Sequence, residues 1–237
     1  MTKLKVMCAR SMTSAVNSLS AAFTRDTGKA LGVDLDITFG TVGALQAKLA
    51  GGETADVLVL GAPAIAAMER SGAVVAGSGK AIARTSVGVA VREGAPAPDI
   101  STAAAFKQAL RDARAVAFSD AAVGGSAGVH LAALWGRIGM AEEIARKGMP
   151  QKSGGEVAAR VAEGAADIGL TLIAEIVPVA GARVIGKLPA PLGNDTTYAA
   201  GISATCTNRA AAAAFVDALA RPSGRDVWTA AGFDWVG

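Results

Sequence analysis

Hydroxyl groups, glycines and one arginine are the side chains of this sequence best placed to do chemistry. They lie in four short segments, each at the expected N-terminus of a helix: residues 8–12, 40–43, 123–128 and 152–155. Hydroxyls and the free backbone N–H groups of a helix N-terminus bind anions. Taken alone, each of the first two segments is better explained by ordinary helix capping or a strand-to-helix turn. The four together favour a bound anion held by neutral donors.

Two residues beside these segments could add charge or proton transfer. Arg10 precedes Ser11 in the first segment, where a guanidinium could hold a carboxylate through two hydrogen bonds. His130 follows the third segment and could move a proton near neutral pH. The alternative interpretations are a surface ion pair for Arg10 and a half-buried packing role for His130.

The composition excludes several classes of protein. A single histidine and two distant cysteines, Cys8 and Cys206, provide no metal-binding or disulfide spacing, so we expect no metal and no cofactor. A net charge of +3 without a run of basic residues argues against a nucleic-acid partner. The 29 glycines and the 51% hydrophobic content instead favour closely packed α/β layers.

Strand-like and helical patterns alternate along the whole chain, which predicts parallel sheets covered by helices. The expected strands are 4–8, 33–39, 56–60, 86–91, 115–118, 168–172, 183–185 and 198–204. The expected helices are 13–24, a helix carrying Leu45 and Leu49, 63–71, 101–113, 129–138, 156–163 and 208–220. No long linker interrupts them, so two lobes would have to be joined by crossing strands.

The beginning of the sequence bears on location. Met1-Thr2-Lys3-Leu4-Lys5 runs directly into an apolar strand, without the apolar region and cleavage site of a secretory signal. No segment is long enough to span a membrane. The sequence as given therefore predicts a cytoplasmic protein. If a signal peptide has been removed from it, the prediction is a periplasmic protein.

Several ordered motifs resemble a known superfamily. They are Ala9-Arg10-Ser11-Met12, 37–41 (Ile-Thr-Phe-Gly-Thr), 51–57 (Gly-Gly-Glu-Thr-Ala-Asp-Val) and 228–233 (Trp-Thr-Ala-Ala-Gly-Phe). In their order and spacing the chain resembles the type 2 periplasmic-binding-protein superfamily, and within it the molybdate-binding branch of ABC-transporter solute receptors. The resemblance implies two Rossmann-like α/β lobes with mixed, mainly parallel sheets, joined by two crossover strands, with a ligand cleft between them. Lobe I would comprise 1–83 and 203–237, and lobe II 84–202.

The resemblance also implies a set of ligand contacts. In this sequence they fall on Arg10, Ser11, Met12, Thr41, Val42, Gly125, Ser126, Ala127, Gly154, Gly155 and Thr171. Two of them depart from the family. Molybdate receptors bind their ligand with neutral groups, whereas Arg10 is charged, and Thr171 replaces the tyrosine usual in that late strand. Both departures argue against molybdate, and Arg10 favours a carboxylate.

Two functions from different classes follow. The first is a receptor that closes its two lobes on a small anion, a di- or tricarboxylate or else molybdate or sulfate, and that partners an ABC-transporter permease only if it is exported. The second is a metal-independent isomerase of a polycarboxylate, since the branch includes relatives similar to aconitate isomerase. Its candidate catalytic residues are Arg10, Ser11 and His130.

Overall fold

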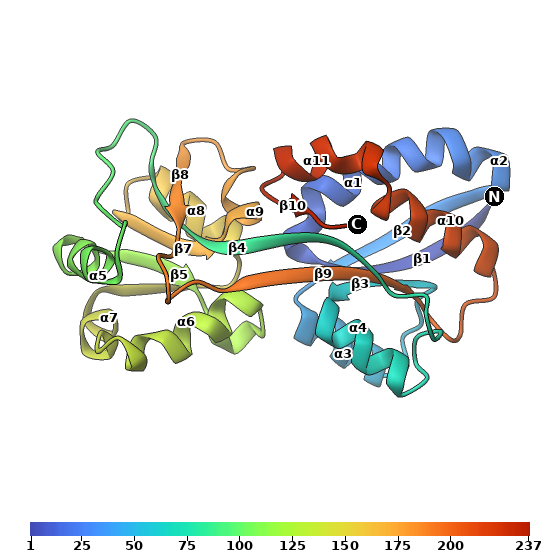
Figure 1. Ribbon diagram of the computed structural model, residues 1–237, viewed down its shortest axis with the longest axis horizontal. Helices are drawn as coiled ribbons and strands as arrows, with labels where there is room; N and C mark the ends of the chain where they lie inside the picture. Colours follow the sequence, from blue (N-terminus) through green and yellow to red (C-terminus); the bar gives the residue numbers. More distant parts are fainter. The chain divides into compact units, whose positions relative to one another are not determined.

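A computed structural model describes all residues, 1–237, and the chain divides into two compact units. Unit 1 consists of Met1–Arg84 and Thr197–Gly237, and unit 2 of Thr85–Thr196. The chain therefore passes between the units inside two strands, β4 (Lys80–Arg92) and β9 (Asp195–Ile202) (Figure 1). Residues 198–202 belong with unit 1 because they pair with β3 (Val57–Gly61).

The sheet of unit 1 has the strand order β2-β1-β3-β9. Strand β1 (Thr2–Ala9) runs parallel to both β2 (Val33–Gly40) and β3, and β9 runs antiparallel to β3. A short strand, β10 (Asp234–Trp235), pairs with the first part of β4. Buried apolar residues on both faces of β1 and β3 explain their continuous hydrophobic pattern.

Helices cover both faces of this sheet (Figure 1). One face packs on α3 (Val42–Ala50) and α4 (Ala62–Arg70), where Leu45 and Ile65 are buried beside Met7, Leu58 and Leu60. The other helices of unit 1 are α1 (Thr13–Phe23), α2 (Lys29–Leu31), α10 (Arg209–Ala220) and α11 (Arg225–Ala230).

An edge-to-face contact between two aromatic rings joins the first and the second sequence stretch of unit 1 in its core. The ring of Phe23 lies 5.1 Å from that of Phe215, so α1 packs on α10. Trp228 of α11 is fully buried, and its indole N–H donates to the carbonyl of Leu219. The last helices are thus part of the same core as the first.

Unit 2 repeats the layered plan with its own sheet, in the order β4-β7-β5-β6, with β8 also paired to β4. Strands β5 (Val116–Ser119), β6 (Gly148–Gln151) and β7 (Ile168–Leu172) are parallel. Strand β8 (Ala182–Lys187) and β7 run antiparallel to β4. The sheet is therefore mixed, as predicted.

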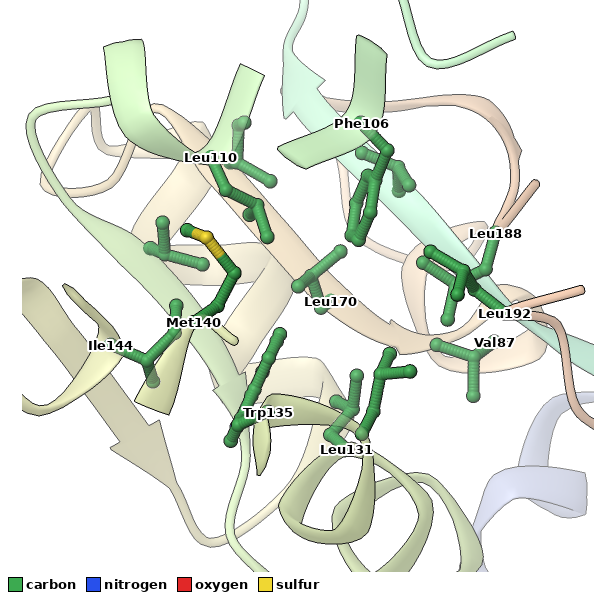
Figure 2. Close-up of a cluster of buried hydrophobic side chains, with 14 of the residues drawn as sticks. Val87, Phe106, Leu110, Leu131, Trp135, Met140, Ile144, Leu170, Leu188 and Leu192 are labelled. Carbon is green, nitrogen blue, oxygen red and sulfur yellow. The ribbon is translucent and has the colours of Figure 1, made fainter. Parts of the chain in front are cut away.

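The main core of unit 2 lies between this sheet and helices α5 (Ala103–Asp112), α6 (Ser126–Arg137) and α7 (Ala141–Lys147). Figure 2 shows Phe106 and Leu110 facing Leu131 and Trp135 around Leu170. On the opposite face, α8 (Gly154–Ala162) and α9 (Ile173–Ile176) cover the sheet. Successive side chains of β7 therefore point alternately to the main core beside α5, α6 and α7 and to the face covered by α8 and α9.

The predicted alternation of strands and helices is confirmed, with differences at particular positions. The helix expected at 129–138 begins earlier, at Ser126, and the expected loop 119–128 includes its first turn. Gly128 lies inside that turn, and the position requires glycine because a Cβ there would overlap the backbone of Asp120. The sequence pattern does not predict α2, α7, β6, α9, α11 or β10. None of the helices combines the length and the apolar character needed to cross a lipid bilayer.

Candidate functional site

Strand direction explains why the candidate residues of unit 1 gather at one edge of its sheet. Ala9 pairs with Gly40 at the carboxyl ends of the parallel strands β1 and β2, so the segments that follow start side by side. Strand β9 runs the other way, which places Tyr198 opposite Gly61 at the carboxyl end of β3. Ligands of open α/β sheets bind at such edges.

Arg10, Ser11 and Met12 have different environments. The Arg10 side chain is exposed and forms no ion pair. Ser11 is 9% exposed, and its hydroxyl donates a 2.8 Å hydrogen bond to the Tyr198 hydroxyl. Met12 is fully buried, so its side chain packs in the core and only its backbone could serve a ligand.

Thr41 and Val42 begin helix α3. The Thr41 hydroxyl accepts a 3.2 Å hydrogen bond from the backbone N–H of Ala44, the geometry of an N-cap. Because that bond uses a lone pair, the hydroxyl proton is left for another acceptor. Val42 packs against the cluster that contains Leu45.

In unit 2 the third polar segment forms the start of α6. Gly125 is the N-cap residue and has no neighbouring atom where its Cβ would be. The Ser126 hydroxyl accepts a 3.1 Å hydrogen bond from the Thr196 hydroxyl and keeps its own proton to donate. Ala127 is buried in the main core. This segment offers a hydroxyl and helix N–H groups to an acceptor.

The fourth polar segment opens α8 as a reciprocal cap. The Ser153 hydroxyl accepts from the N–H of Glu156 at 3.2 Å, and the Glu156 carboxylate accepts from the N–H of Lys152 at 3.1 Å. The backbone N–H groups of Gly154 and Gly155 lie in the unpaired first turn. The helix expected at 156–163 begins two residues earlier, at Gly154, so the two glycines form its first turn.

Thr171 is the centre of a buried polar cluster that also contains Ser119 and Glu175. Its hydroxyl lies 2.8 Å from that of Ser119 and donates to the Glu175 carboxylate at 3.0 Å. Thr171 is fully buried and Ser119 is 7% exposed, whereas Glu175 is partly exposed. Gly154 packs so closely on this cluster that a Cβ would overlap both the Thr171 hydroxyl and the Glu175 carboxylate.

His130 lies in α6, one turn beyond Ser126. Its Nε2 is 2.9 Å from the carbonyl oxygen of Leu192. A carbonyl only accepts, so Nε2 carries the proton, and in the neutral ring Nδ1 holds the free lone pair. This geometry gives His130 one nitrogen anchored to the backbone and one available as a base.

The cysteines are ordinary buried thiols. Burial raises the pKa of Cys8 well above its usual range. Burial and a hydrogen bond to Asp56 raise the pKa of Cys206 to about 11. Thiols with raised pKa values are poor nucleophiles at neutral pH. No group of three His, Cys, Asp or Glu side chains is arranged to hold a metal ion.

Three residues of these clusters were not among the sequence candidates: Ser119, Glu175 and Tyr198. Glu175 had one visible signal, since it and Thr171 are the only polar side chains in the apolar run 168–177. Tyr198, the single tyrosine, is 187 residues from Ser11, so no local spacing could reveal their hydrogen bond.

Comparison with curated proteins finds a relative of known activity. The chain is 30% identical over 223 residues to an aconitate isomerase from Pseudomonas sp., a match that covers 92% of this chain and 82% of the relative. The similarity to this aconitate isomerase is therefore detectable in sequence along nearly the whole chain.

Solved structures share the fold at lower identity. The periplasmic molybdate-binding protein of Azotobacter vinelandii matches with a TM-score of 0.77 and 20% identity, covering 99% of this chain and 100% of that one. The sulfate-binding protein of Mycobacterium tuberculosis H37Rv matches with a TM-score of 0.77 and 20% identity, over 100% of this chain and 88% of that one. The family described as bacterial extracellular solute-binding protein matches residues 4–234. The chain therefore belongs to the bacterial extracellular solute-binding protein family, as its motifs predicted.

Proposed function

We propose that this protein is a receptor for a small anion and that its preferred ligands are carboxylates. The observation that carries the proposal is the collection of donors at the carboxyl edges of both sheets. Unit 1 offers the Thr41 hydroxyl, and unit 2 offers the Ser126 hydroxyl with the first-turn N–H groups of Gly154 and Gly155. Such donors complement negative charge without a metal.

Arg10 supports a carboxylate as the preferred ligand. Its guanidinium is exposed, free of ion pairs and next to Ser11 at the edge where β1 ends. A planar guanidinium can hold the two oxygens of a carboxylate through two parallel hydrogen bonds, and such a charged group is not needed by a receptor that binds its anion with neutral donors. The relatives named for molybdate and sulfate support the coarser statement, an anion receptor.

The test is a thermal-shift titration against molybdate, sulfate, citrate, cis-aconitate and trans-aconitate. A ligand present at a hundredfold excess over its Kd should raise the Tm by roughly 5–10 °C. We expect the largest shift with a carboxylate. A shift with molybdate alone would contradict the carboxylate preference, and no shift with any of the five would contradict anion binding.

A second function, isomerisation of a polycarboxylate, is favoured by the sequence match to an aconitate isomerase. Moving a double bond requires a base that takes a proton from one carbon and returns it to another. His130 is the candidate because its anchored Nε2 leaves Nδ1 free. Arg10 and Ser11 would hold the carboxylates.

The isomerase function is tested by incubating the protein with trans-aconitate and following the cis isomer by NMR. Turnover that is lost in His130→Gln but retained in Arg137→Gln, an exposed residue of the same helix, would support it. Anion binding with no turnover at high protein concentration would leave the receptor as the function.

A further inference from the structure

A polar cavity of unit 1 is separate from the proposed anion site. It has a volume of about 370 Å³, a size at which small molecules bind, and its lining residues come from β1, β2 and the loop between α3 and β3. None of them is a candidate anion contact. Lys5 of the cavity precedes Ala9 by four positions, so the cavity lies about 13 Å back along β1 from the edge where those contacts begin.

The cavity forms where α3 ends. This helix starts near the carboxyl edge of the sheet and is about 13 Å long, so it covers the second half of β1 and leaves the first half open. Gly52, with a φ of 92°, then turns the chain into the loop that forms one wall. Two contacts hold this loop: Glu53 pairs with Lys48 at 2.8 Å, and the Asp56 carboxylate accepts the backbone N–H of Lys5 at 2.8 Å. The wall is therefore fixed by the fold.

Lys5 and Asp36 give the cavity one charge of each sign. They are register partners in the parallel strands β1 and β2, so their side chains leave the same face of the sheet. Both residues are exposed, and neither forms an ion pair. The charge of Glu53, which also lines the cavity, is already balanced by Lys48. The charged groups left for a ligand are therefore one ammonium and one carboxylate.

The rest of the lining is polar and small. Thr38 and Thr54 contribute hydroxyl groups, and neither hydroxyl has a hydrogen-bond partner within the protein. Met7 also lines the cavity, but it is only 4% exposed, so it offers a ligand little apolar surface. A ligand of this cavity should therefore carry polar groups and no large apolar one.

From this lining we propose that the cavity binds a free α-amino acid with a small polar side chain. The carboxylate of the amino acid pairs with the Lys5 ammonium, and its ammonium pairs with the Asp36 carboxylate. A ligand with only a carboxylate meets the like charge of Asp36, and a ligand with only an amine meets that of Lys5. An exposed ion pair between Lys5 and Asp36 themselves would contribute little, so the amino acid displaces no strong contact.

Three compounds that differ by one charged group test this proposal. L-Serine carries both charges, 3-hydroxypropionate lacks the ammonium, and ethanolamine lacks the carboxylate. Each is titrated at pH 7.5 while the amide signals of the isotope-labelled protein are followed by NMR, up to about 50 mM because two such contacts give weak binding. We expect L-serine to shift the amides around Lys5, Asp36 and Gly52. It should bind at least about tenfold more tightly than either analogue, which is the effect of one charge-assisted hydrogen bond.

Lys5→Gln and Asp36→Asn each remove one of the two charges from an exposed side chain. Either change should weaken L-serine binding at least about tenfold. Ethanolamine should bind Lys5→Gln no more weakly than the unaltered protein, because that change removes the charge that repels it. Lys3→Gln is the matched control: Lys3 is exposed on the same face of β1 and does not line the cavity, so this variant should keep the affinity for L-serine.

Three results would overturn this inference. They are the absence of amide shifts around the cavity, equal affinities for L-serine and its two analogues, and a loss of L-serine affinity in Lys3→Gln as large as that in Lys5→Gln. If one of the two cavity variants does not fold, the other variant and the comparison of the three compounds still decide. The proposed anion receptor uses none of these residues, so the inference and that function are tested independently.

Discussion

The hydroxyl of Ser11 donates a 2.8 Å hydrogen bond to the hydroxyl of Tyr198. The two residues lie at opposite ends of the sequence, and the antiparallel course of β9 brings them to the same edge of the unit 1 sheet. Both are buried, so the bond holds the segment after β1 to the strand in which the chain returns to unit 1.

Tyr198→Phe should lower the free energy of unfolding by about 1–3 kcal/mol, because it leaves the buried Ser11 hydroxyl without this acceptor. Urea denaturation followed by tryptophan fluorescence measures the change. In a Ser11→Ala background the same substitution should cost less. Equal costs in the two backgrounds would show that this hydrogen bond contributes nothing to stability.

Gly154→Ala and Gly155→Ala are neighbours in the first turn of α8 and should have opposite effects. A Cβ at Gly154 would overlap the Thr171 hydroxyl and the Glu175 carboxylate, and such overpacking costs about 1–3 kcal/mol. A Cβ at Gly155 meets no atom within 4 Å, so that change should be neutral or stabilise by up to about 1 kcal/mol. Thermal denaturation of the two variants measures the change in stability. Equal losses of stability in both would contradict the close packing at Gly154.

Arg10→Ala should leave the Tm unchanged and weaken citrate binding at least tenfold, because charge-assisted hydrogen bonds are worth about 1.5–3 kcal/mol. Calorimetric titration with citrate gives the affinity. Arg70→Ala removes an exposed positive charge from the end of α4 in the same unit and should change the affinity little. An equal loss in both variants would indicate a general charge effect rather than a contact made by Arg10.

The thiols should react slowly with a disulfide reagent at pH 8 in the folded protein and rapidly in guanidinium chloride.

The fold raises the pKa of Cys206 from 9.0 to about 11, so the folded state holds that proton more tightly than the unfolded chain. Its contribution to stability is therefore complete below pH 9.0 and is lost as the pH rises toward 11. The free energy of unfolding of Cys206→Ser should therefore fall less over that pH interval than that of the unaltered protein. An identical fall in both would contradict the raised pKa of Cys206.

Much of the fold is predictable from local pattern. Strand β7 lies where its apolar run predicts, and α8 begins beside the serine and glycines that mark its cap. The start of α6 was misplaced because Gly128 suggested a loop, whereas it is a helical residue packed on the Asp120 backbone. Local composition reports that a glycine is needed, but not which neighbour requires it.

The candidate site was less predictable because its internal bonds cross long stretches of sequence. Ser119 and Thr171 are 52 residues apart, and their bond exists because β5 and β7 are neighbouring strands. The pattern that predicted each strand contains no information about which strands pair. Thr171 is a ligand contact that the resemblance implies, and only the position of Glu175 shows that the Thr171 hydroxyl proton is donated to a carboxylate of the protein.

The division of unit 1 into two stretches of sequence has a consequence for biosynthesis. A ribosome completes residues 85–196 while unit 1 still lacks β9 and the helices that follow it. Phe23 has no Phe215 to pack against until residue 215 has been made. At that stage every residue of the unit 2 core has been made, whereas α10 and α11 are still missing from the core of unit 1. Apolar surface left exposed during synthesis is prone to aggregation, so this interval is the one in which the chain is most exposed to it.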